Sequence, residues 1–172
     1  TGDTLIAAAR TPSTLAFLGS SDRLLPVRLD VTDSAQAADA VAAGIERFGQ
    51  IDILVNNAGI SFLGAVEETS ADHVKRLFET NVFGLLNVTR AVLPHMRGRR
   101  RGHIVNIASV AGYSGYAGFG VYSGTKFAVE GLSLSVAEDV ERFGIKVTVV
   151  EPGFFRTHLL DARNIRYTSS SI

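Results

Sequence analysis

Cysteine is absent from this chain of 172 residues, and its absence excludes several kinds of chemistry. Without thiols the chain forms no disulfide, offers no thiolate nucleophile and holds no iron–sulfur cluster. The four histidines are scattered along the chain and do not show the spacing of metal ligands. We therefore expect no metal site.

Excess charge and long apolar runs are also missing. The 17 basic residues balance the 17 acidic ones, so no overall charge attracts nucleic acid, anionic membranes or acidic substrates. No apolar run approaches the roughly 20 residues that span a bilayer, and the first residues lack the pattern of a signal peptide. We expect a cytoplasmic protein that recognises a small molecule locally and binds neither nucleic acid nor membrane.

What the chain does contain is an alternation of short apolar runs with stretches of helical spacing, which is typical of repeated βα units. Several of the apolar runs lack polar residues, as strands covered on both faces of a parallel sheet should. The chain has no linker or internal repeat, so we expect one α/β domain over residues 1–172. The expected strands are 4–9, 26–30, 51–57, 103–108 and 146–151.

Two apolar stripes at helical spacing predict helices that cover this sheet. The first stripe consists of Ala35, Ala38, Val41, Ala42, Ile45 and Phe48. The second consists of Val74, Leu77, Phe78, Val82, Leu85 and Leu86.

Three of the expected strands run directly into polar or glycine-bearing loops, with the sequences NNAG at 56–59, ASVAG at 108–112 and EPG at 151–153. In a parallel sheet these strand ends share one edge, and open α/β sheets bind ligands beyond that edge. One such loop often does no more than turn the chain toward the next helix. Three together predict a binding cleft.

Tyr122 and Lys126 are four residues apart in a stretch that reads as a helix, so their side chains share one face. A tyrosine ionises near pH ~10, but an adjacent ammonium stabilises the phenolate and lowers this pKa. The pair is therefore a candidate acid–base device, although the same spacing also arises on ordinary helix surfaces.

Two further polar residues point to the same cleft. Ser109 stands just past the strand expected at 103–108, where its hydroxyl can bond a substrate oxygen, although a loop serine is often only a turn residue. Asn81 falls on the second apolar stripe, where a buried amide costs roughly 1 to 3 kcal/mol unless it is hydrogen-bonded. It either bonds a nearby backbone carbonyl or belongs to a relay of backbone and water that leads to the cleft.

These residues together resemble the short-chain dehydrogenases/reductases of the classical type. The matching features are NNAG at 56–59, Asn81 in NVFG, Ser109, Tyr122 with Lys126, and PGFFRT at 152–157, in the family's order and approximate spacing. The match looks closest to the hydroxysteroid and retinol dehydrogenase-like branch. It implies a Rossmann-like, doubly wound parallel sheet with the strand order 3-2-1-4-5-6-7.

The resemblance also implies an oxidoreductase that moves a hydride between NAD(P) and an alcohol or carbonyl substrate. Tyr122 would exchange the hydroxyl proton, and Lys126 would bind the nicotinamide ribose and lower the tyrosine's pKa. Ser109 would orient the substrate oxygen. Asn81 would hold, at a distortion of its helix, a water that connects the lysine to solvent.

Cofactor contacts carry over from the family in the same way. Asp30 and Val31 match the acidic and apolar pair at the adenine ring. The remaining contacts are Asn57, Ala58 and Gly59 at the adenosine ribose, Tyr122 and Lys126 at the nicotinamide ribose, and Pro152, Gly153 and Thr157 beside the nicotinamide.

The choice of dinucleotide depends on the end of the strand expected at 4–9. NAD-preferring relatives place an acid there, whereas Ala9 precedes Arg10 in this chain. A guanidinium matches a 2′-phosphate and no carboxylate repels it, so we expect NADP in preference to NAD. The alternative is that Arg10 is a surface residue at the start of a loop.

One departure from the family concerns its first strand and glycine-rich phosphate loop. Residues 1–8 imitate the start of that loop, but Ile6 and Ala8 stand where it needs glycines, and the segment reads as a strand. We expect the chain to lack the first strand, which would leave unpaired strand edges inside the domain, and to lack the family's C-terminal substrate region as well.

Residues that flank the expected cleft favour an apolar substrate, although aromatic side chains beside a sheet are more often core. They are Leu63, Val110, Tyr113, Phe119, Phe154 and Phe155. The departure keeps a second function open, a non-catalytic dinucleotide-binding or interaction protein on the same scaffold.

Family members usually pair through the helices that hold Asn81 and Tyr122, so we expect a homodimer or homotetramer. The residues that could supply this surface are Leu85, Leu86, Val92, Phe127, Leu132 and Val136. The basic run at 97–102 reads as a helix end closed by glycine rather than as a nucleic-acid site.

Overall fold

The computed structural model describes residues 2–153 and 165–167. All five expected strands are present, and each pairs with its neighbour in the parallel direction. They are β1 (Leu5–Ala9), β2 (Leu24–Arg28), β3 (Ile53–Asn56), β5 (Gly102–Ile107) and β6 (Ile145–Val150). Two short strands that the sequence pattern did not reveal, β4 (Ser61–Leu63) and β7 (Ile165–Tyr167), pair with each other.

The five longer strands form two separate sheets. One contains β1 and β2, and the other has the order β3-β5-β6. Within the described ranges no strand pairs with both β1 and β3 to join the two sheets. The expectation of unpaired strand edges is therefore confirmed. Ile53 and Val55 of β3 are 60% and 55% exposed accordingly. The segment at 5–9 is a strand followed by a short 3-10 helix, η1 (Pro12–Leu18), which confirms that it is not a phosphate loop.

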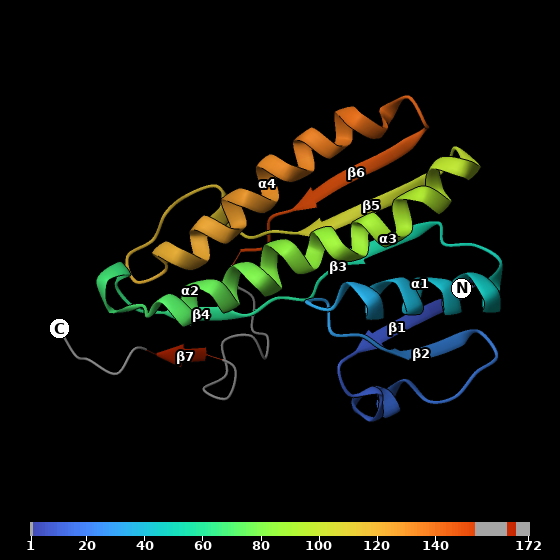
Figure 1. Cartoon of the computed structure of the whole chain (residues 1–172), viewed down its shortest axis with the longest axis horizontal. Helices are drawn as coiled ribbons and strands as arrows, with labels where there is room; N and C mark the ends of the chain where they lie inside the picture. Colours follow the sequence, from blue (N-terminus) through green and yellow to red (C-terminus); the bar gives the residue numbers. More distant parts are fainter. Residues whose placement is uncertain (1, 154–164, 168–172) are drawn as a thin grey trace.

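Two long helices pack against the three-stranded sheet, α3 (Gly84–Arg99) on β3 and β5 and α4 (Gly120–Glu141) on β6 (Figure 1). The other helices are α1 (Ser34–Phe48), α2 (Ala71–Phe78), and the short turns η2 (Val66–Glu68) and η4 (Val110–Gly112). A π-helical turn, η3 (Glu79–Phe83), joins α2 to α3. No helix in the described ranges combines the length and the apolar character that a membrane crossing requires.

Helix α1 begins and ends at residues suited to those positions. The Asp33 carboxylate accepts hydrogen bonds from the backbone N–H groups of Ala35 and Gln36, and Gly49 closes the helix with a φ of 77°. Both features agree with the known preferences for capping residues, because a carboxylate satisfies free N–H groups and glycine adopts the left-handed conformation without strain.

The apolar stripe expected for α1 is confirmed only in part. Val41 is buried and Ile45 packs against the core, whereas Ala35, Ala38 and Ala42 are exposed, and the buried residues of the helix are Ala37, Ala40, Val41 and Gly44. The three exposed alanines carry little apolar area, so they do not determine which face is buried. The lack of a side chain at Gly44 lets the buried face of α1 approach β1, because a Cβ at this position would collide with the side chain of Ile6.

The second stripe is confirmed, since none of its residues is exposed. The main core lies where α1, α3 and α4 meet the strands. Its buried members are Val41, Ile51, Val92, Met96, Ile104, Val140 and Ile145.

The basic run at 97–102 forms the end of α3, as expected, but a glycine does not close it. Arg100 takes the left-handed conformation there, with a φ of 51°. Its guanidinium donates to the carbonyl oxygen of Arg142 at 2.7 Å, and Arg99 forms an ion pair of 2.8 Å with Asp52. These local contacts account for the run as a helix end.

We predict that Val92→Ala lowers the free energy of unfolding by about 2 kcal/mol, because Val92 is 2% exposed and truncation leaves a cavity. Val66→Ala removes the same atoms from a side chain that is 66% exposed, and should change stability by less than about 0.5 kcal/mol. Urea unfolding of both variants tests the position of the core, and equal losses would show that it is misplaced.

Candidate active site

Ser109, Tyr122 and Lys126 lie together at the carboxyl end of β5. Ser109 follows this strand and caps η4, where its hydroxyl accepts a hydrogen bond of 3.2 Å from the Ala111 N–H. Tyr122 and Lys126 are on the first turns of α4, each 7% exposed. The Ser109 side chain acts on the pKa of the Tyr122 hydroxyl, and the Lys126 Nζ lies 5.7 Å from the centre of the tyrosine ring. Three residues that the sequence singled out thus occupy one place.

Burial dominates the protonation of this cluster. It raises the pKa of Tyr122 above its ordinary value, and the hydrogen bond with Ser109 acts in the opposite direction. It also lowers the pKa of Lys126 to about 8. The expectation that Lys126 lowers the tyrosine's pKa is not met in this structure, because its ammonium donates to the Ile107 carbonyl oxygen, at 2.8 Å. At neutral pH the tyrosine is a proton donor.

The Lys126 ammonium has capacity for a ligand. It carries three N–H donors, and its hydrogen bond to Ile107 is its only one within the described part of the chain. Gly59 lies close by, since a Cβ placed on it would be 3.9 Å from the Lys126 Nζ and 3.4 Å from the Asn81 Oδ1. Two open donors beside a glycine backbone suit the adjacent hydroxyl groups of a ribose.

Asn81 lies on the π-helical turn η3, so the helix distortion that the resemblance implied is present at this residue. Its amide is 2% exposed and fully occupied. The Oδ1 accepts from the Ile60 N–H at 2.8 Å, and the Nδ2 donates to the Ile60 carbonyl at 2.9 Å and to the Thr125 Oγ1 at 3.1 Å. Of the two alternatives for Asn81, the structure shows the hydrogen bond to a nearby backbone carbonyl, that of Ile60.

Thr125 is a member of the site that the sequence reasoning missed. Its hydroxyl is 0% exposed, accepts from Asn81 and donates to the Tyr122 carbonyl at 2.7 Å. Through it, Asn81 braces the loop at 56–60 against the first turns of α4. The signal was available, because Thr125 lies between Tyr122 and Lys126 on the buried face of the same helix.

Glu130, one turn beyond Lys126, was also missed. Burial raises the pKa of its carboxyl, and the charge of Glu151 at the end of β6 and a hydrogen bond with that residue raise it further. Nothing in the spacing of the two glutamates along the chain indicates this contact, which depends on how α4 lies over β6.

The predicted cofactor residues follow the carboxyl ends of their strands. Arg10 is exposed after β1, and Asn57, Ala58 and Gly59 are exposed after β3. After β6, Pro152 accepts a hydrogen bond of 3.1 Å from the Val110 N–H, and Gly153 follows it. Thr157, Phe154 and Phe155 lie outside the described residues.

Asp30 and Val31 follow β2 and are held by specific bonds. The Asp30 Oδ1 accepts from the N–H and the hydroxyl of Thr32, at 3.0 and 2.8 Å. The Val31 carbonyl accepts from the Asn87 Nδ2 at 3.0 Å, and its side chain packs where a Cβ on Gly84 would collide with it. The turn is thus anchored on α3.

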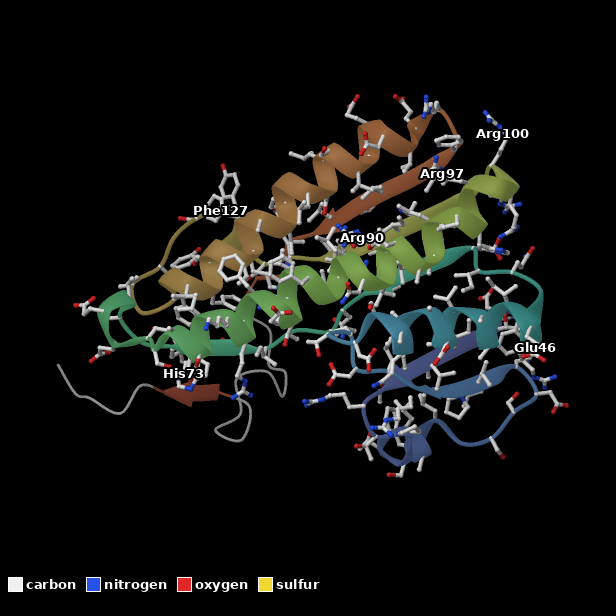
Figure 2. The ribbon with its side chains drawn as sticks, in the orientation of Figure 1. Glu46, His73, Arg90, Arg97, Arg100 and Phe127 are labelled. Atoms are coloured by element: carbon white, nitrogen blue, oxygen red, sulfur yellow. The ribbon has the colours of Figure 1, made fainter. Side chains whose placement is uncertain are left out.

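Figure 2 shows where charge lies relative to this site. Arg97 and Arg100 lie at the end of α3 remote from Phe127, which neighbours Lys126 on α4. The guanidinium groups of Arg97, Arg100 and Arg142 lie 4.7, 6.0 and 4.8 Å from the centre of the Phe143 ring. The basic cluster therefore belongs to the opposite end of the molecule and not to the cleft.

A protein-family model described as short chain dehydrogenase matches residues 2–167. The chain is 46% identical over 137 residues to a 3-ketodihydrosphingosine reductase of Bacteroides thetaiotaomicron, which covers 80% of this chain and 51% of that protein. It is 43% identical over 159 residues to the oxidoreductase BOA17 of Botryotinia fuckeliana, which covers 91% of this chain and 58% of that protein. The chain thus spans between half and two thirds of the length of these relatives.

Solved structures give the same result. A short-chain dehydrogenase from Streptomyces avermitilis superposes with a TM-score of 0.91 at 44% identity, over 99% of this chain and 64% of that one. ElxO with NADP bound gives 0.85 at 33% identity, over 92% and 66%. A short chain dehydrogenase/reductase from Burkholderia phymatum in complex with NAD gives 0.83 at 34% identity, over 93% and 60%. The Rossmann-like α/β fold is confirmed.

We predict that Lys126→Met stabilises the protein at neutral pH by about 1–3 kcal/mol, because it removes a charge that burial disfavours. The pKa of Lys126 is about 8 when folded and 10.5 ordinarily, so the unfolded chain binds more protons between these values. The free energy of unfolding of the parent protein therefore rises with pH across this window. The variant should lack this rise, as denaturant unfolding at about pH 7 and about pH 9.5 would show. If the difference in the free energy of unfolding between the parent protein and the variant does not change with pH, the prediction is contradicted.

Proposed function

The chain belongs to the short-chain dehydrogenase family, and we propose that it is an oxidoreductase that transfers a hydride between a nicotinamide dinucleotide and an alcohol or ketone. The observation that carries this proposal is the convergence of Ser109, which follows β5, with Tyr122 and the buried ammonium of Lys126 on α4. A structural role alone would not require a tyrosine, a serine and a lysine to converge at the edge of a sheet where ligands bind.

The division of labour follows from the geometry. The reduced dinucleotide supplies the hydride when it is bound. The Ser109 hydroxyl lies close enough to that of Tyr122 to affect its pKa, so both can contact one substrate oxygen. Because burial keeps the Tyr122 hydroxyl protonated, it donates its proton to the oxygen of a ketone, and Ser109 holds that oxygen in place. These protonation states favour carbonyl reduction.

In this proposal Lys126 binds the dinucleotide. Its two open donors bind the ribose hydroxyls. We also propose that a water on the backbone of the π-helical turn at Asn81 returns a proton to Lys126 and Tyr122. The turn supports this role because a π-bulge leaves backbone groups of a helix available, and such bulges often occur at functional sites.

We propose NADP rather than NAD as the dinucleotide. Family members with NADP and with NAD bound both superpose on this chain, so the preference rests on its own residues. Arg10 supports it, because this exposed guanidinium follows β1 and has no carboxylate partner within the described ranges. Asp30, Val31 and the loop at 57–59 would lie along the adenosine, and Pro152, Gly153 and Thr157 beside the nicotinamide.

We propose an apolar ketone as the substrate. Leu63, Val110 and Phe119 are only partly buried, and Phe119 meets the ring of Tyr122 edge to face at 6.2 Å. The name of the Bacteroides relative, a 3-ketodihydrosphingosine reductase, supports the proposal because it describes an enzyme that reduces a ketone. The wider resemblance to hydroxysteroid and retinol enzymes points to the same chemical class.

We further propose that the protein is a homodimer or homotetramer. Phe127 and Leu134 on the outer face of α4 are 47% and 67% exposed, which supports pairing through this helix. Two residues expected to take part do not, because Leu85 and Val92 are 8% and 2% exposed within the core. The proposed interface between subunits therefore includes fewer residues than the sequence analysis expected.

We predict that Tyr122→Phe lowers kcat for ketone reduction by about 10²–10⁴-fold, because the proton donor is lost while its ring remains. The assay uses the longest natural form of the chain and follows the absorbance of NADPH with a panel of apolar ketones. Tyr116→Phe makes the same change outside the site and should retain activity within about twofold. Binding of NADPH without turnover by the parent protein would favour the non-catalytic alternative.

We predict that Arg10→Ala weakens binding of NADPH by about tenfold and leaves binding of NADH unchanged, because a charge-assisted contact to the 2′-phosphate is lost. Arg101→Ala, which removes an exposed arginine near the remote end of α3, is the matched control. Fluorescence titration with both nucleotides measures the effect. Equal weakening for the two nucleotides would remove the basis for the NADP preference.

A further inference from the structure

A chain of buried polar side chains crosses the core beneath α3 and α4. The Asn56 Nδ2 of β3 donates to the Thr89 Oγ1 of α3 at 3.0 Å and to the Asn106 Oδ1 of β5 at 2.9 Å. The Asn106 Nδ2 donates to the Ser133 Oγ of α4 at 2.8 Å. All four side chains are 9% exposed or less.

Hydrogen bonds of this kind specify one arrangement of the core. Each amide would leave an unpaired buried group if its partner moved, whereas apolar side chains tolerate a shift. Asn56 and Asn106 are opposite each other in the β3–β5 ladder. A slip of one residue would turn them to opposite faces of the sheet, so the amide pair fixes the register of these strands.

The last link of the chain attaches the catalytic helix. Lys126 and Ser133 are about two turns apart on α4 and both bond to β5. The Lys126 Nζ donates to the Ile107 carbonyl, and Ser133 accepts from the side chain of Asn106, the preceding residue. The Ser133 hydroxyl also donates to the Val129 carbonyl at 2.6 Å. Helix α4 is thus tied to one strand at two points.

The two ties differ in what a ligand does to them. The Lys126 ammonium keeps two donors beyond its bond to the Ile107 carbonyl, so a ribose bound by them, as the proposed function requires, would pull directly on this tie. The side chains of Ser133 and Asn106 are 2% and 3% exposed, so a ligand does not reach the bond between them. One tie is therefore in contact with the ligand and the other is not.

We propose that Ser133, through its hydrogen bond with Asn106, is a positioning residue that keeps Tyr122 and Lys126 in place against β5 when the ammonium of Lys126 also binds a ligand. This inference rests on the proposed function. Thr89 supplies the contrast within the same chain of side chains, because it is equally buried but lies on α3 and holds no catalytic residue.

The test compares Ser133→Ala with Thr89→Val in the longest natural form of the chain. Each variant removes one hydroxyl and leaves one asparagine N–H unpaired, so both should lose similar stability in urea unfolding. Alanine is the most favourable residue in a helix, so Ser133→Ala is expected to fold. Ser133→Thr keeps the hydroxyl and serves as the rescue variant.

The first readout is the titration of Lys126 in ligand-free protein, followed by NMR of isotope-labelled lysine. Loosening of α4 admits water to the ammonium, so we expect Ser133→Ala to raise the Lys126 pKa by about one unit toward its ordinary value. Thr89→Val should leave it unchanged, and Ser133→Thr should restore it. This readout needs no turnover, so it tests the positioning role even if the proposed activity fails.

The second readout separates binding from chemistry. We expect Ser133→Ala to lower kcat about tenfold with less than about a threefold change in the KM for the dinucleotide, because the reacting groups are misplaced rather than removed. Thr89→Val should change neither. Equal effects of the two variants on the Lys126 titration and on kcat would overturn the proposal, as would a Ser133→Ala variant that leaves both unchanged.

Discussion

The site depends on one constraint: the ammonium group of Lys126 is buried, and a single backbone carbonyl accepts a hydrogen bond from it. Lys126 is 7% exposed and bonds only the Ile107 oxygen in the described chain. Its burial lowers its own pKa to about 8 and leaves two donors for a ligand. The same enclosure raises the pKa of Tyr122, so its hydroxyl stays protonated. Stability is lost in order to place these charges, as is common at functional sites.

Polar bonds, rather than apolar packing alone, determine where these groups lie. Asn81 bonds both backbone groups of Ile60 and reaches Thr125, so hydrogen bonds join the π-helical turn, the end of the NNAG loop and α4. On the other side of Lys126, Ser133 joins α4 to β5 through Asn106. The catalytic turns are thus fixed from two directions by buried hydrogen bonds, whose loss is costly because their partners would remain unpaired.

The sequence predicted the five strands, the second apolar stripe and the convergence of Ser109, Tyr122 and Lys126, because strand ends and helical spacing are local features. It did not predict the buried face of α1, where alanines gave no strong signal and the decisive contact, Gly44 against Ile6, is tertiary. The pKa of Tyr122 was also predicted in the wrong direction, because burial and the orientation of the Lys126 ammonium are not visible in the spacing of two residues. Thr125, Asn106 and Ser133 were missed for the related reason that ordinary polar residues within helices and strands give no signal until their partners are known.

The central claim is that these residues direct a hydride to a carbonyl carbon. Its most direct test is to incubate the longest natural form of the chain with NADPH that carries deuterium at the reactive position of the nicotinamide, together with apolar ketones, and to examine the alcohol product by mass spectrometry. The account predicts deuterium on the carbon that bears the new hydroxyl. An alcohol that contains no deuterium, or nucleotide binding with no alcohol from any ketone, would contradict it.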